Sequence, residues 1–338
     1  MNAIGFVYIR KYFEFMDIAT GNTKTVFIIN PIAGTRQKEV IVDSIKQVFS
    51  EGEYETLFTE YPGHAFELTR QKLKEGFTNI VAVGGDGTVN EVASALVGEP
   101  CKVGIIPAGS GNGLARHLHI PVQVSAALAV IKQHKIQVID AGKVNGRYFF
   151  CTCGTGFDAT VGKKFADNAR RGMASYVRAT IHQYISYSPK TYVLKTSHKK
   201  VKLKAFLVTF ANSGQYGNNA YIAPNAIIDD GMLDLCVLRP FPKTSTLEIG
   251  LRLFFKNIDQ SPYLELMRVK KATLKRRGKR KITIHLDGEP VTMKNKLKVR
   301  VIPGAVQVMI PAVPRNKMPR FLIEGIRPIG IRTDWKVF

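Results

Sequence analysis

Between residues 24 and 135, the chain repeats one local pattern four times: an apolar run, a loop, and then an amphipathic stretch. The apolar runs are TVFII, YETLF, NIVAVGG and KVGIIPAG. Short apolar runs bounded by glycine or proline are typical of buried strands, and the amphipathic stretches are typical of helices. Strands that alternate with helices favour a parallel sheet with its functional site at the carboxyl ends of the strands. We therefore predict an α/β, Rossmann-like domain over residues 24–139.

The pattern changes after residue 140. Short alternating runs such as GRYFFCTCGTG, MLDLCVL and KITIHLDGEPVTMK predict strands and hairpins, with helices expected near 161–187 and 245–257. We therefore predict a β-rich second domain over residues 140–312. Residues 1–23 and 313–338 fit neither pattern and are treated as an amino-terminal extension and a carboxyl-terminal tail. The extension could be an interfacial amphipathic helix, but a segment without a function is the favoured interpretation.

Charge and cysteine content limit the possible partners and compartments. The formal net charge is +23, which favours a polyanionic partner, either nucleic acid or an anionic membrane surface. Basic residues concentrate in two runs, 198–204 and 269–281. Four scattered cysteines do not form a disulfide framework, and neither a signal peptide nor an apolar membrane span is apparent. A cytoplasmic protein is the simplest interpretation.

The third predicted strand ends in the stretch VGGDGTVNE, whose three glycines leave the backbone without side chains. Glycines allow an anionic ligand to approach the main chain, and the helix that follows offers free N–H groups to phosphate. Thr88 and Glu91 have the spacing of a capping box, which predicts that the helix starts at Thr88. Asp86 would repel phosphate unless a cation lay between them, so we expect Mg²⁺ there.

A second glycine-rich loop, PAGSGNGLARHL, follows the fourth strand. Its Ser110 and Asn112 precede a helix from which Arg116 could reach a phosphate. Such loops can also simply join strands to helices, but a chance match to GGDGT is rare in a chain of this length. Neither a P-loop nor a GxGxxG fingerprint is present. The two loops therefore indicate a nucleotide site of another kind.

Six motifs together resemble one known superfamily. They are INPIAG (29–34), VGGDGTVNE (83–91), IPAGSGNGLAR (106–116), TGFDA (155–159), ANSGQYGNNAYIAPNAIIDDGMLDL (211–235) and LDGEP (286–290). In order and spacing they resemble the diacylglycerol kinase and sphingosine kinase superfamily, and especially the soluble bacterial lipid kinases of the diacylglycerol kinase B and YegS type. The chain departs from many members at Ala108-Gly109-Ser110, where a Gly-Thr pair is common, although serine keeps the hydroxyl.

This resemblance implies a Rossmann-like domain followed by a β-sandwich, with ATP bound between them and Mg²⁺ as cofactor. The implied activity is phosphorylation of a lipid hydroxyl, most simply that of diacylglycerol to give phosphatidic acid. A sphingoid-base or ceramide kinase is an alternative. An NAD kinase also uses GGDGT but lacks the GSGNGLAR and LDGE elements. We expect no nucleic acid partner, because the chain lacks the common nucleic-acid-binding signatures.

The resemblance also implies roles for individual residues. Glu289 would be the general base with Asp287 in support, although on the residues alone the Asp-Gly pair favours a simple hairpin turn. Asp86 would act in catalysis and hold Mg²⁺, and Asp230 would bind a structural Mg²⁺ with the carbonyls of Ile227 and Met232. The implied nucleotide-binding residues are Asn30, Pro31, Ala33, Gly34, Thr59, Gly84, Gly85, Asp86, Gly87, Thr88, Asn90, Ser110, Asn112 and Arg116.

Two expectations concern assembly and location. A homodimer is expected from the resemblance alone. Two basic runs within one domain of a lipid kinase suggest peripheral, reversible association with the inner face of an anionic membrane, because each cation near such a surface contributes about 1 kcal/mol.

Overall fold

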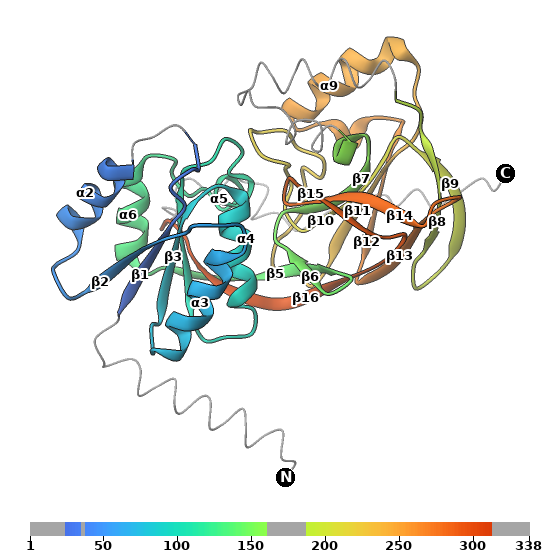
Figure 1. The fold of residues 1–338 in the computed structure, drawn as a ribbon. Helices are drawn as coiled ribbons and strands as arrows, with labels where there is room; N and C mark the ends of the chain where they lie inside the picture. Colours follow the sequence, from blue (N-terminus) through green and yellow to red (C-terminus); the bar gives the residue numbers. More distant parts are fainter. Residues whose placement is uncertain (1–23, 35–37, 161–186, 313–338) are drawn as a thin grey trace.

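The structure, a computed structural model, describes residues 24–34, 38–160 and 187–312 (Figure 1). The amino-terminal extension 1–23, the tail 313–338 and most of the helix predicted near 161–187 lie outside the described residues. Within the described ranges, every helix is too short or too polar to cross a membrane.

The first domain is the predicted parallel α/β unit. Its sheet has the order β2-β1-β3-β4, with all neighbours parallel. Helices α2 and α6 cover one face of this sheet, and α3 and α4 cover the other. The elements are β1 (Thr25–Ile29), α2 (Lys38–Val48), β2 (Tyr54–Phe58), α3 (His64–Lys74), β3 (Asn79–Gly84), α4 (Asp86–Ala95), β4 (Lys102–Pro107), α5 (Gly113–His117) and α6 (Val124–Gln133).

The predicted capping box in the third unit is wrong. Helix α4 begins at Asp86 after an extended Gly85, and no side chain caps it. Glu91 instead accepts hydrogen bonds from the backbone N–H groups of Gly63 and Ala65, at 2.8 and 3.1 Å. It therefore caps the neighbouring helix α3, because the two helices pack side by side on one face of the sheet.

The second domain is the expected β-sandwich, and α9 confirms the helix predicted near 245–257. One layer is a sheet of order β12-β11-β10-β7-β14-β15, which packs across an apolar core onto β16, β13 and β8. The elements are β5 (Ile136–Val144), β6 (Arg147–Phe149), β7 (Thr152–Gly156), β8 (Lys190–Lys195), β9 (Lys200–Ala205), β10 (Leu207–Ala211), β11 (Leu233–Leu238), η2 (Lys243–Ser245), α9 (Thr246–Phe254), η3 (Ile258–Gln260), β12 (Leu264–Val269), β13 (Lys271–Arg276), β14 (Lys281–Leu286), β15 (Glu289–Lys294) and β16 (Lys296–Met309).

Strand β16 joins the two domains. Its first half pairs antiparallel with β13, and Gln307 and Val308 near its end pair parallel with Lys102 and Val103 of β4. Strand β5 runs antiparallel along β16 on both sides of residue 140. Among the described residues, one sheet of ten strands therefore runs through both domains (Figure 1). The chain passes from the first domain to the second inside a strand.

We expect Gly142→Ala to destabilise this junction. Gly142 pairs with Phe149 across β5 and β6, and a Cβ at Gly142 would overlap the buried Phe149 ring. Overpacking of this kind costs about 1–3 kcal/mol. Denaturant unfolding would measure the loss, with Gly250→Ala as control, because nothing lies within 4 Å of a Cβ there and alanine favours the helix. Equal stability of Gly142→Ala and the wild type would contradict this packing.

Candidate active site

The two glycine-rich loops lie against each other. Strands β3 and β4 are parallel neighbours that end in register at Gly84 and Pro107, so their loops leave the sheet together. A Cβ added to Gly109 would lie 2.5 Å from the Cα of Gly85, a separation that only glycine allows. As a result, bare backbone from both loops faces the carboxyl edge of the sheet.

The loop after β1 joins the same edge. The Asn30 side chain donates to the Thr88 hydroxyl at 3.1 Å, and its oxygen accepts from the Ile32 N–H at 3.0 Å. Gly34 has φ +66° and lies so close to the Ala108 carbonyl that a Cβ would overlap it. The Asn30–Gly34 loop, which includes Pro31 and Ala33, is therefore placed beside both glycine loops.

Two further predicted nucleotide-binding positions lie at this edge. Thr59 follows β2, and its N–H donates to the Ile29 carbonyl at 2.9 Å. Ser110 is exposed on the second glycine loop.

Asn112 and Arg116 shape the second glycine loop. The Asn112 amide accepts from the Gly109 N–H at 3.0 Å and donates to the Gly109 carbonyl at 2.8 Å. Arg116 Nε donates to the Gly111 carbonyl at 3.1 Å. Both side chains thus brace the loop from within.

Asp86 lies where the two glycine loops and the second domain meet. Its Oδ1 accepts from the Gly113 N–H at 2.7 Å, and a side chain at Gly111 would come within 2.7 Å of its Oδ2. Burial, together with the charges of Asp287 and Glu289, raises the pKa of Asp86 to about 7. A cation beside this carboxylate would offset both effects.

The second domain contributes the turn between β14 and β15. Asp287, at the start of this turn, is buried and accepts from the N–H groups of Phe150 (2.9 Å), Cys151 (2.7 Å) and Thr152 (3.0 Å), and from the Asn90 amide (2.7 Å). Burial raises the pKa of Asp287, although these donors oppose the rise. With four donors on its two oxygens, Asp287 anchors the turn.

Glu289 has the opposite environment. It is exposed, and a Cβ added to Gly87 would lie 3.5 Å from its Oε1. The carboxylate therefore faces the Gly84–Thr88 loop across the boundary between the domains, with Asp287 fixing the turn behind it.

The structure gives Asn90 a different role from the one expected. Its amide nitrogen donates to the Tyr148 carbonyl at 3.1 Å and to Asp287, and its oxygen accepts from the Ser94 hydroxyl at 3.3 Å. These contacts occupy the side chain within the protein. We therefore assign the Asn90 side chain to the joint between the domains, and its contact with the nucleotide stays a prediction.

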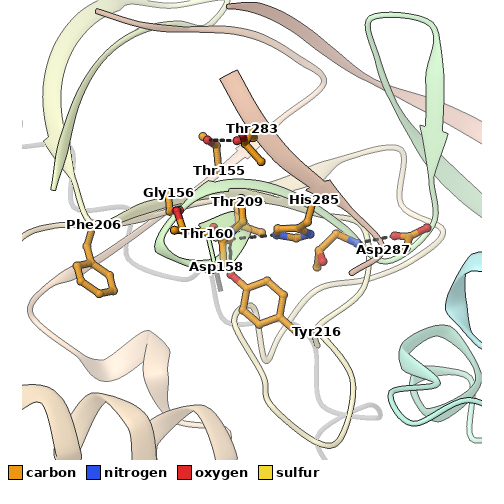
Figure 2. Close-up of polar contacts among 12 residues, drawn as sticks. Thr155, Gly156, Asp158, Thr160, Phe206, Thr209, Tyr216, Thr283, His285 and Asp287 are labelled. Carbon is orange, nitrogen blue, oxygen red and sulfur yellow. Dashed lines mark hydrogen bonds and ion pairs between the residues drawn. The ribbon is translucent and has the colours of Figure 1, made fainter. Parts of the chain in front are cut away.

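The sequence did not predict the polar network around Asp158 (Figure 2). Asp158 Oδ2 lies 3.0 Å from both the Thr209 hydroxyl and His285 Nε2, and 3.3 Å from the Tyr216 hydroxyl. A Cβ at Gly154 would overlap Asp158 and His285, so glycine is needed there. The TGFDA motif was a signal for Asp158. His285 directly precedes the LDGEP motif, but nothing in the sequence indicated that it contacts Asp158.

The loop 212–222 connects this network to the glycine loops. It contains Tyr216, and its Asn218 N–H donates to the Gly111 carbonyl at 3.2 Å. Its Gly214 N–H donates to His117 Nδ1 on α5 at 3.3 Å. Burial lowers the pKa of His117 to about 4, so the ring is a neutral acceptor near neutral pH.

The expected structural metal site at Asp230 stays a prediction. Asp230 accepts from the Met232 N–H at 2.9 Å and forms an ion pair with Arg268, which already neutralises the carboxylate. The ligands expected from Ile227 and Met232 are backbone carbonyls, and the Ile227 side chain is exposed. The described part of the chain contains no cluster of three or more His, Cys, Asp or Glu side chains suited to a metal. A site of one carboxylate and two backbone carbonyls is not of that kind, so Asp230 remains a candidate Mg²⁺ ligand.

Each of the two domains matches a known protein family. Residues 24–144 match the family described as the diacylglycerol kinase catalytic domain, and residues 151–310 match the YegS C-terminal NAD kinase beta sandwich-like domain. A Pseudomonas aeruginosa (strain UCBPP-PA14) protein named "Probable lipid kinase YegS-like" is 31% identical over 255 residues, covering 74% of this chain and 82% of the relative. The chain belongs to the family of YegS-like lipid kinases. The members of this family are phosphotransferases with an alcohol acceptor.

Other relatives agree with this assignment to the YegS-like lipid kinases. A protein of the same name from Pectobacterium atrosepticum is 28% identical over 263 residues, covering 74% of this chain and 83% of the relative. The crystal structure of a diacylglycerol kinase from Bacillus anthracis str. Sterne superposes with a TM-score of 0.67 at 19% identity, covering 86% of this chain and 97% of that one. At that identity the superposition establishes the fold.

Asp86 should make the stability of this YegS-like kinase depend on pH. Its pKa rises from 3.8 to about 7 on folding, so the folded state holds the proton more tightly and the free energy of unfolding falls as pH rises from about 4 to about 7. We expect the free energy of unfolding of Asp86→Asn to depend less on pH. At pH 8 it should exceed that of the wild type by on the order of 1–3 kcal/mol. Denaturant titrations across this pH range, without Mg²⁺ or nucleotide, would measure the difference. Parallel pH profiles for the two proteins would contradict the prediction.

Proposed function

We propose that this chain transfers the γ-phosphoryl group of ATP to the hydroxyl of diacylglycerol, forming phosphatidic acid, with Mg²⁺ as cofactor. One observation carries the proposal: an exposed carboxylate, Glu289, faces a bare glycine loop that also contains Asp86. A base opposite a phosphate-binding loop is the minimum that phosphoryl transfer to an alcohol requires.

The nucleotide phosphates would bind at the edge formed by the three loops. The amino terminus of α4 presents free N–H groups after Gly85, and a helix amino terminus attracts anions. Asn30 and Thr88 fix the relative positions of two of the loops, and the hydroxyl of Ser110 is exposed on the third. These contacts support a preorganised phosphate site.

Mg²⁺ fits this site through one protein ligand. Asp86 is buried near two other carboxylates, and its raised pKa marks an uncompensated negative charge. A hard cation prefers such an oxygen ligand and takes its remaining ligands from phosphate and water. The ion would offset the charge that develops on the transferred phosphoryl group.

Glu289 would take the proton of the acceptor hydroxyl. Asp287 holds the turn through donors on both domains, so the base keeps a fixed position over the glycine loop. Because Glu289 is exposed, it can pass the proton on to solvent after transfer.

The identity of the acceptor rests on the relatives. The Bacillus anthracis structure carries the name diacylglycerol kinase, and the net charge of +23 supports work at an anionic membrane surface. The homodimer remains a prediction from the resemblance.

We expect Glu289→Gln to lower kcat by about 10²–10⁴-fold while the free energy of unfolding stays close to that of the wild type. The assay would supply labelled ATP and Mg²⁺ with micelles containing diacylglycerol, sphingosine or ceramide in parallel. Glu39→Gln, an exposed carboxylate on α2, is the matched control.

Label in diacylglycerol alone, lost in Glu289→Gln and kept in Glu39→Gln, would support the proposal. Label in sphingosine or ceramide would move the acceptor to another lipid. Label in none of the three, together with phosphorylation of NAD, would replace the proposal with an NAD kinase.

A further inference from the structure

Helix α9 carries an apolar stripe that faces away from the protein. Leu247, Leu251, Phe254 and Phe255 are 73%, 47%, 52% and 72% exposed. Their spacing of four, three and one residues places them on one face of the helical segment. Large exposed apolar patches of this kind mark sites of contact with another apolar surface.

The opposite face of α9 is already packed. Ile249 is buried and Leu253 lies against the same cluster, which covers the outer face of β10 and β11. Helix α9 therefore has one apolar stripe in the protein core and a second one outside it. Folding of this chain does not require the second stripe, because a surface helix normally needs only one.

The charges around α9 suit an anionic bilayer. Arg252 and Glu248 pair with each other at 2.8 Å on the flank of the helix. Lys243 precedes the helix and Lys256 follows it, with Lys256 Nζ 4.3 Å from the centre of the Tyr221 ring. A helix that lies in a membrane interface typically has leucine and phenylalanine on one face and cations near its ends.

Helix α9 is also connected to the active site. The Tyr221 N–H donates to the Leu253 carbonyl at 2.8 Å, and Asn218 in the same loop donates to Gly111 of the second glycine loop at 3.2 Å. The loop 212–222 therefore touches both α9 and the proposed nucleotide site. This loop gives α9 a direct structural link to the proposed active site.

We propose that α9 is the membrane-docking element of this protein, and that Leu247, Leu251, Phe254 and Phe255 insert into the interface of an anionic phospholipid bilayer. This proposal rests on the proposed function, because a lipid acceptor embedded in the membrane is the reason that docking is needed. Insertion itself is a property of the surface and can be measured without catalysis.

A second candidate surface lies on the other side of the sandwich. Lys143, Arg300 and Lys271 are direct neighbours across β5, β16 and β13, and Lys195 is paired with Lys200 on β8 and β9. Lys200 and Lys271 belong to the basic runs 198–204 and 269–281, and we call these five residues together the basic face. The two sheets and both apolar cores separate this face from α9 (Figure 1).

One flat bilayer therefore cannot contact both surfaces of a single molecule. We favour α9 because the loop 212–222 joins it directly to the active site. The basic face supplies long-range attraction to anionic lipid and becomes the competing hypothesis in the test.

The test is sedimentation of the full chain with vesicles of phosphatidylcholine and phosphatidylglycerol, without ATP or diacylglycerol. We expect the double variant Leu247→Ser and Phe255→Ser to reduce the partition coefficient by on the order of 10–100-fold, because two large apolar side chains no longer insert. Val40→Ser is the matched control, since Val40 is also an exposed apolar helical residue, at 57%. Denaturant unfolding of each variant would check that the fold is kept.

Loss of binding in the α9 variant, with binding kept by Val40→Ser, would support the proposal. Wild-type binding by a folded α9 variant would overturn it. So would loss of binding in Lys271→Ser with Arg300→Ser while the α9 variant still binds, because the basic face would then be the docking surface. Absence of wild-type binding to anionic vesicles would overturn it as well. None of these results depends on the kinase assay, so failure of the proposed catalytic function would be seen separately.

Discussion

The geometry of the site depends on one buried carboxylate. Asp287 lies on the second domain, yet its donors include Asn90 on α4 of the first domain and the backbone between β6 and β7. A carboxylate removed from water is costly unless it is fully hydrogen-bonded, so these donors and Asp287 must be positioned together. Both the Glu289 turn and the helix that starts at Asp86 take their places from this contact.

A second polar cluster, around Asp158, contacts strand β14, which leads into the Asp287 turn. His285 lies on β14 two residues before Asp287 and contacts Asp158, while its Nδ1 is buried without a partner among the described residues. Tyr216 joins Asp158 to the loop 212–222, which touches the second glycine loop. His285 near the end of β14 and Asp287 in the turn that follows are thus both held by polar contacts. Such connected networks fix one arrangement, because partial loss of partners leaves buried polar groups unsatisfied.

The sequence was sufficient where local chemistry determines structure. The glycine loops, the parallel strands and the Asp-Gly turn follow from residue types and spacing over a few positions, whereas the role of Glu289 came from the resemblance. The sequence was insufficient where a partner lies far along the chain. Glu91 caps α3 rather than α4, Asn90 donates to Asp287 of the second domain, and Arg268 forms an ion pair with Asp230. The return of β16 to β4 is equally non-local, because periodicity predicts a strand but not its neighbour.

The continuity of β16 restricts how this enzyme can move. Many two-domain kinases bind substrates by rotating one domain against the other about a flexible connection. Here a single strand is hydrogen-bonded to β13 in one domain and to β4 in the other, with β5 alongside it. A wide rotation would have to break that ladder or bend the sheet. The pairing of β16 with β5 is irregular between Ile302 and Val306, and Gly304 there has φ +58°. Relative motion of the two domains is therefore confined to bending of the shared sheet, and this stretch is where the sheet bends most easily.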